Sequence, residues 1–208
     1  MGLPAYLNPL RVWFYLTLIV IVLPIAAVGW FAYDNFTSGF AAKGATPGAI
    51  ENFGARLIRH LAIPEARRDA PNPLEPSPDI IADARAHFAD HCAICHANNG
   101  SGDTPIGRNV YPPSPDLRSP DTQGLKDGEL FWVIHYGIRF TAMPGWGEGD
   151  PDKDLDSWKL VHFIRHLPKI TPAELEEMKK LNPKSRHDLD DAAAADAFLS
   201  GADGGHHH

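Results

Sequence analysis

The sequence has few of the residues that mark several common classes of protein. Two cysteines among 208 residues exclude a framework of several disulfides and a zinc site built from two cysteine pairs. Basic side chains are also scarce. Up to Pro78 there are six Lys and Arg against five Asp and Glu, a net charge of about +1. From Asp79 onward there are 13 Lys and Arg against 21 Asp and Glu, a net charge of about −8. Because binding to nucleic acid requires a basic surface, we expect no nucleic-acid partner.

The two cysteines lie close together, as Cys92 and Cys95, and His96 follows directly. A redox disulfide of the thioredoxin kind has this spacing, but it should be near a βαβ pattern, and none is evident. C-x-x-C-H is also the attachment sequence of c-type haem. In one helical turn the two sulfurs could each bond a vinyl group of the haem, and His96 could bind its iron. The motif therefore predicts one covalently attached haem c.

Charged residues are missing from a long stretch near the N-terminus, Val12–Tyr33. About 20 apolar residues span a bilayer as a helix, and aromatic residues at both ends of this stretch are typical of the two interfaces. A cleaved signal peptide has a shorter apolar region and a small-residue cleavage site, and a buried soluble helix would have a polar face. We therefore predict a cytoplasmic segment 1–11 and a transmembrane anchor 12–33. The rest would lie on the periplasmic side of the inner membrane, where haem attachment takes place.

Residues 34–78 are predicted to connect the anchor to a folded domain. In the first part of this connector, four apolar residues have the spacing of one face of a helix. They are Ile50, Phe53, Leu57 and Leu61. This amphipathic helix has a positive flank, and it could lie on an anionic membrane surface, on the domain or on a partner subunit. Five prolines follow between Pro64 and Pro78. They predict an extended, semi-rigid spacer that reaches on the order of 40 Å.

Residues 79–168 resemble the monohaem class I cytochrome c family. The resemblance is carried by the first helix and the attachment motif, through Ala84, Phe88, Cys92, Cys95 and His96. The family usually has glycine where Ala84 stands. The resemblance implies an all-α, cytochrome c-like haem domain with long loops, whose last helix crosses its first. Phe163 and Ile164 should then meet Ala84 and Phe88.

The resemblance also implies a methionine as the second ligand of the haem iron. Met1 lies on the other side of the membrane, and Met178 lies beyond the domain. Met143, in "RFTAMPGW", follows the motif by about 50 residues in a loop rich in glycine and proline. It also precedes a proline, as this ligand commonly does in the family. His135 is the main competitor, and we expect it on the surface or rim of its helix.

Other residues are predicted to surround the haem. In the family a proline carbonyl accepts a hydrogen bond from the proximal histidine, and Pro113 is the best candidate for it. The further candidates for lining the haem are Tyr111, Trp132, Tyr136, Arg139 and Trp146. Each of them could instead be an ordinary core or surface residue. We expect His162 and His166 to face solvent or the rim of the domain.

Residues 169–208 form a predicted helical tail. Thr171, Pro172 and Glu174 make the start of a strong helix with a capping box, on which Leu175 and Met178 could pack against the domain or a partner. A second short helix is expected after Asp188. The final three histidines are either a tag remnant or a natural end that binds metal weakly.

These features predict a membrane-anchored electron carrier of a respiratory chain and not an enzyme, with no small-molecule substrate. Its partners would be the membrane and redox proteins such as a quinol-oxidising complex or a terminal oxidase or reductase. A fixed haem subunit of such a complex is the first alternative. A haem enzyme or gas sensor is the second, and it would require an open position on the iron.

Overall fold

The computed structural model describes residues 8–184, 190, 193–196 and 199. Within this part of the chain the regular structure is entirely helical, which confirms the predicted all-α fold class. The chain forms two compact units, Met1–Ala42 and Lys43–His208. The expected second tail helix lies largely outside the described residues, and the terminal histidines lie wholly outside them.

The first unit contains the long helix α1 (Pro9–Thr37). The Asn8 side chain accepts a hydrogen bond from the Leu10 amide at 3.0 Å, and Pro9 occupies the first turn, where its missing N–H costs nothing. None of its residues is buried, and apolar side chains lie on every side of it. One N-terminal helix is thus long and apolar enough to cross a membrane, as predicted.

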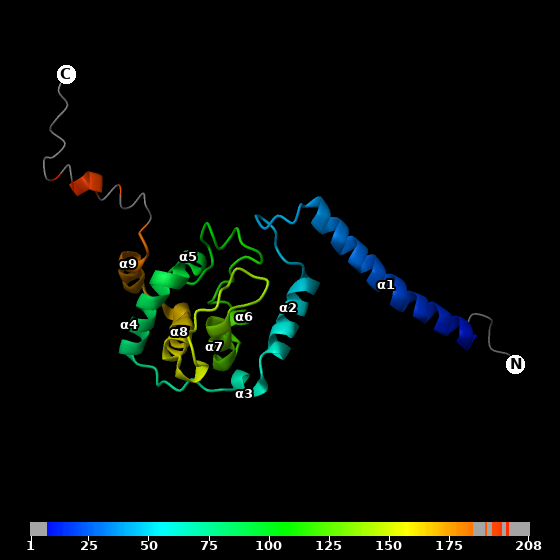
Figure 1. Ribbon diagram of the computed structural model, residues 1–208, viewed down its shortest axis with the longest axis horizontal. Coiled ribbons are helices and arrows are strands. Elements are labelled where there is room, and N and C mark those ends of the chain that lie inside the picture. Colours follow the sequence, from blue (N-terminus) through cyan, green and yellow to red (C-terminus); the bar gives the residue numbers. More distant parts are fainter. Residues whose placement is uncertain (1–7, 185–189, 191–192, 197–198, 200–208) are drawn as a thin grey trace, which may run out of the picture. The chain divides into compact units, whose positions relative to one another are not determined.

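The core of the second unit is built where α4 (Pro78–His87) crosses α8 (Leu155–His166). Ala84, Phe88 and Phe163 are all buried, and the two phenylalanine rings lie 5.1 Å apart between centroids. The predicted contact between the first and last helices of the domain is therefore confirmed (Figure 1). The Ser77 hydroxyl caps α4 by accepting a hydrogen bond from the Ile80 amide at 3.2 Å.

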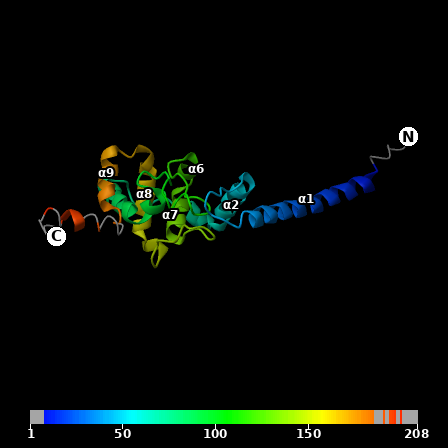
Figure 2. The ribbon, with the colours of Figure 1, turned by 90° about the horizontal axis from the view of Figure 1, so that it is seen from above.

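Helix α7 (Asp127–Tyr136) packs against α8, with Phe131 stacked on Trp158 at 4.3 Å between ring centroids. The short helix α6 (Pro120–Gln123) precedes it. Gly137 ends α7 with φ of 70°, a conformation that glycine adopts without strain. Helices α9, α8, α7 and α2 follow one another across the unit in Figure 2.

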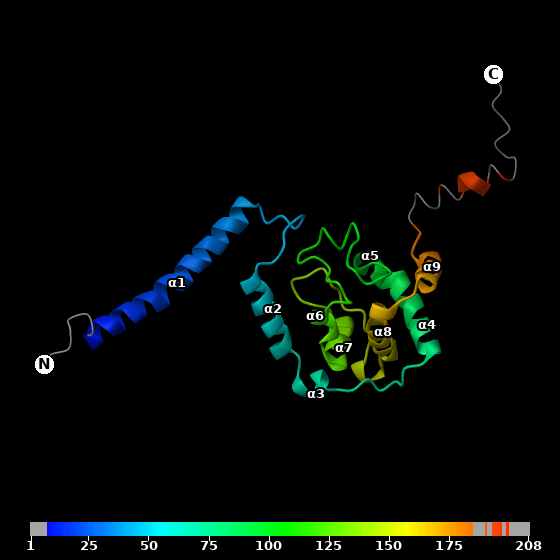
Figure 3. The same cartoon turned by 180° about the vertical axis from the view of Figure 1, so that it is seen from behind.

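Residues 49–78 of the connector pack on the domain instead of forming a free spacer. Helix α2 (Ala49–Ala62) is followed by α3 (Glu65–Arg68), which lies so close to α7 that a Cβ on Gly128 would be 2.1 Å from the Arg67 carbonyl oxygen. Farther along, the Asn72 amide donates to the Trp158 carbonyl at 2.9 Å, and His162 Nε2 donates to the Leu74 carbonyl at 2.8 Å. Prolines remove amide donors from this segment, but its remaining polar groups bind α8, so it follows the surface of the unit (Figure 3).

Candidate haem-attachment site

The two cysteines lie in an irregular helical turn directly after α4. The chain passes through a π-helical turn, Phe88–Cys92, and then α5 (Ala93–His96). π-Helical turns are often found at functional sites. The helix stops at Ala97, which has φ of 61°. Both cysteines are half-buried free thiols, so one short turn presents both sulfurs and the imidazole of His96.

The environment of the cysteines keeps them protonated. Burial, followed by the neighbouring Cys95, raises the pKa of Cys92 to about 12. Burial also raises the pKa of Cys95. Cysteines that attack disulfides have lowered pKa values. The described residues also contain no cluster of three or more His, Cys, Asp or Glu side chains that could hold a metal ion. The turn therefore does not fit a zinc site or a disulfide exchanger.

His96 suits a haem ligand. Burial lowers the pKa of its ring, which favours the neutral imidazole that binds metals, and the Pro115 carbonyl opposes this shift more weakly. Nδ1 is buried, yet it completes no hydrogen bond of normal geometry. If Nδ1 were bonded to that carbonyl, Nε2 would be left to hold the iron of a bound haem. The acceptor that faces the ring is thus Pro115, two residues after the predicted Pro113.

The loop after the attachment turn folds back tightly onto it. Gly102 donates its amide to the His96 carbonyl at 2.8 Å. A Cβ on Gly107 would be only 2.2 Å from the Cys95 carbonyl oxygen. In the same loop Pro113 is half-buried, and the Tyr111 hydroxyl donates to Glu51 Oε1 on α2 at 2.5 Å. Burial and this carboxylate raise the pKa of Tyr111 to about 12.

Met143 lies in a second loop that the structure brings to the attachment turn. The Met143 carbonyl accepts from the Ile138 amide at 3.1 Å, and its amide donates to Thr141 Oγ1 at 3.1 Å. Trp146 donates its amide to the end of α7, and its ring lies 5.4 Å from that of His91, edge to face. Because His91 precedes Cys92, the Met143 loop and the attachment turn are neighbours. Arg139 is exposed in this loop and forms no hydrogen bond or ion pair among the described residues.

Comparison with known families agrees with this geometry. Residues 79–164, less than half of the chain, match the family described as cytochrome C oxidase, cbb3-type, subunit III. This segment is a c-type cytochrome domain. The match implies a covalently bound haem c, and electron transfer as the role of the domain. Comparison with curated proteins gives no significant match.

His135 of the cytochrome domain is buried, and our expectation of a surface or rim position was wrong. Its Nδ1 lies 2.5 Å from Asp154 Oδ2, and a Cβ on Gly147 would overlap its ring. Burial alone would raise the pKa of Asp154, but hydrogen bonds from Ser157 and His135 outweigh it and lower that pKa. Asp154 also caps α8 by accepting a hydrogen bond from the Ser157 amide at 3.0 Å. His135 therefore holds the start of α8 against the end of α7.

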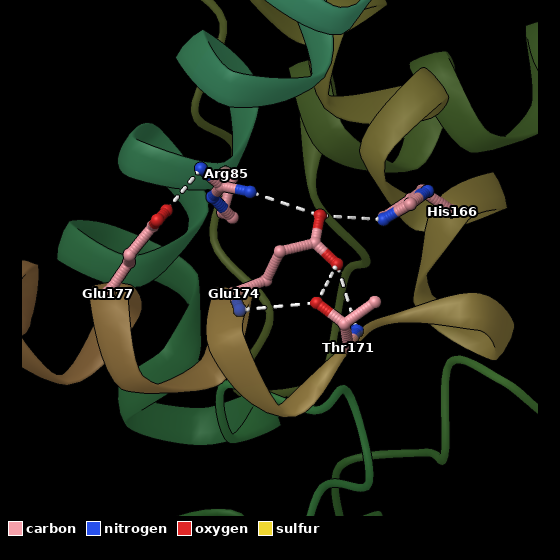
Figure 4. Close-up of polar contacts among 5 residues, drawn as sticks. All are labelled: Arg85, His166, Thr171, Glu174 and Glu177. Atoms are coloured by element: carbon pink, nitrogen blue, oxygen red, sulfur yellow. Dashed lines mark hydrogen bonds and ion pairs between the residues drawn. The ribbon is translucent and has the colours of Figure 1, made fainter.

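Helix α9 (Pro172–Leu181) holds the attachment turn from the other side. Met178 is fully buried, and α9 contacts both α4 and the π-helical turn. The Glu174 carboxylate accepts hydrogen bonds from Arg85 at 3.0 Å and from His166 at 2.8 Å, and it also bonds Thr171 (Figure 4). The predicted capping box is present. We had expected His166 at the rim, but it serves as a half-buried partner of Glu174.

This cluster predicts that acid loosens α9. Burial would raise the pKa of Glu174, but bonds from Thr171 and His166 lower it from 4.5 to about 2. Its contribution to stability is therefore complete above pH 4.5 and is lost as pH falls toward 2. We expect Glu174→Gln to remove about 2–3 kcal/mol of that acid-sensitive stability. Urea unfolding of the holoprotein between pH 6 and pH 3 would measure it, with the exposed Glu176→Gln as control. Equal pH dependence in the two variants would refute the assignment.

Proposed function

We propose that the cytochrome domain is a membrane-tethered one-electron carrier in which His96 and Met143 would hold the haem iron. When bound, the haem supplies reversible one-electron oxidation and reduction of its iron. The observation that carries the proposal is the contact of Trp146 with His91, because it places the Met143 loop beside the turn that bears Cys92, Cys95 and His96. Two protein ligands leave no open position for a substrate.

The surrounding residues would adjust the ligands. In this proposal the Pro115 carbonyl accepts a hydrogen bond from His96 Nδ1, which fixes the imidazole plane and increases its basicity. The Met143 thioether is a soft ligand that favours the reduced iron and raises the reduction potential. The Ile138 amide and the Thr141 hydroxyl fix the backbone of Met143. Because these contacts hold the two ligands in place, the site would need little rearrangement when the iron is oxidised or reduced.

We further propose that the domain lies on the periplasmic side of the inner membrane and works in a respiratory chain. Helix α1 supports the membrane attachment. The covalent haem supports the periplasmic side, since c-type haem is attached there. Docking with redox partners would be small and transient, and the acidic domain would steer them by charge.

A fixed subunit of an oxidase complex is the second candidate. The family matched by residues 79–164 is described by its place in a cbb3-type oxidase as subunit III. The connector also packs along the domain, so it provides less free length than a mobile carrier would use. Co-purification in mild detergent separates the two functions, because a fixed subunit would elute with its complex.

One experiment tests the carrier function against a haem enzyme or gas sensor. The purified holoprotein in detergent is reduced and exposed to carbon monoxide, and its absorption spectrum is recorded before and after. If His96 and Met143 both hold the iron, we expect the spectrum to stay unchanged at gas concentrations that convert an open haem. Ready formation of a carbon monoxide adduct would overturn the His96 and Met143 assignment.

A further inference from the structure

Helix α2 is bound to the domain through its polar side. Arg56 pairs with Asp121 at 2.6 Å, and His60 Nδ1 lies 3.1 Å from the buried Glu129 carboxylate. Burial against the domain lowers the pKa of Arg59, and the nearby Glu129 carboxylate partly offsets this shift. An amphipathic helix usually packs its apolar side on the protein core and leaves its polar side in water. Here the arrangement is reversed.

The apolar side of α2 is exposed as a result. Its five large apolar residues retain much of their accessible surface: Ile50 89%, Phe53 70%, Leu57 46%, Ile58 68% and Leu61 70%. Four of them recur at spacings of three and four residues and lie on one face of the helix. No charged residue interrupts that face. Uncharged apolar surfaces of this extent on a polar protein mark sites of protein or membrane contact.

The length of the connector indicates which surface is available to this face. Helix α1 ends at Thr37 and α2 begins at Ala49. The eleven residues between them, 38–48, reach at most about 40 Å when fully extended. A bilayer spanned by α1 is therefore always within reach of α2, at a high effective concentration. A partner subunit or a second copy of the chain would first have to encounter it.

We propose that the apolar face of α2 lies in the surface of the same lipid bilayer that α1 spans. The proposal rests on the membrane-anchored function proposed above. Phe53, Leu57 and Leu61 would enter the boundary between headgroups and acyl chains, as the apolar faces of interfacial helices do. The polar side, which such helices turn to water, is here occupied by the domain.

Such binding would also orient the haem domain. Because Arg56, His60 and Glu51 hold α2 to Asp121, Glu129 and Tyr111, the domain cannot rotate freely about α2. Tyr111 belongs to the loop that folds back on His96. That loop would therefore face the membrane side, where a redox partner embedded in the same bilayer would meet it.

Photo-crosslinking in membranes tests this proposal. Phe53→p-benzoylphenylalanine places an aromatic crosslinker on the apolar face of the full-length holoprotein, and Ala55→p-benzoylphenylalanine places it at an exposed position outside that face. Membranes from expressing cells are irradiated, and the adducts are identified by mass spectrometry. We expect lipid adducts at position 53 to exceed those at position 55 by about tenfold or more, since burial of one large apolar side chain contributes at least that factor.

Two results would overturn the proposal. Adducts of position 53 with a protein, whether another copy or a different subunit, would show that α2 is a protein-docking face. Equally few lipid adducts at both positions would show that the face remains in water. Neither result depends on the iron ligands, which the carbon monoxide experiment tests, so a failure here is distinguishable from a failure of the proposed function.

Discussion

The double substitution Cys92→Ala, Cys95→Ala is expected to leave the cytochrome domain largely unfolded. The domain has about 90 residues and long loops, and a chain of that size gains little stability from its own apolar burial. The loops around the attachment turn are closed by backbone contacts, such as the Gly102 amide on the His96 carbonyl. A covalently bound haem supplies the apolar surface on which these loops can pack.

Far-UV circular dichroism of the detergent-solubilised protein measures this effect. Helix α1 should remain helical in the holoprotein and in the double variant. The helical signal that the double variant loses should therefore correspond to helices α4 to α9. The control is Ile94→Ala, which lies between the cysteines, is half exposed and leaves both thioether bonds in place. Native-like helicity in the haem-free double variant would mean that the polypeptide packs without the haem, and the expectation would fail.

Local sequence signals predicted the parts of this protein that depend on near neighbours. The apolar stretch that became α1 and the capping box at Thr171 each involve residues close in the chain. The contact of Phe88 with Phe163 followed from the resemblance to a family, because no local rule links residues so far apart.

Tertiary contacts explain what the sequence did not reveal. His135 is buried because Asp154, nineteen residues later, pairs with it, and helical periodicity gives no sign of such a partner. The prolines of residues 64–78 predicted an extended chain, but not the hydrogen bonds from Asn72 and His162 that fix it to α8. The apolar spacing of α2 was evident, and its orientation was not, because acceptors on two other helices draw its basic side inward.

Replacing Met143, the proposed methionine ligand of the iron, should also have a large effect. Met143→His is expected to lower the reduction potential by on the order of 0.1–0.2 V, because axial ligands tune haem potentials over about 0.8 V and imidazole favours the reduced state less than a thioether does. Met143→Ala should open one side of the iron, so that the reduced protein binds carbon monoxide readily. Spectroscopic redox titration and gas binding measure the two changes.

The chain offers a matched control, since Met178 is also a methionine and is fully buried in α9. Met178→Leu keeps the side-chain volume and should cost less than about 1.5 kcal/mol of stability, with the potential and the gas affinity unchanged. If Met143→Ala left both properties unchanged, another residue would hold the iron. His135 would not be the natural replacement, because its ring is committed to Asp154. The iron would then be held by a different residue or open on that side, and an open iron would replace the role of a closed electron carrier with that of a gas-binding or catalytic haem.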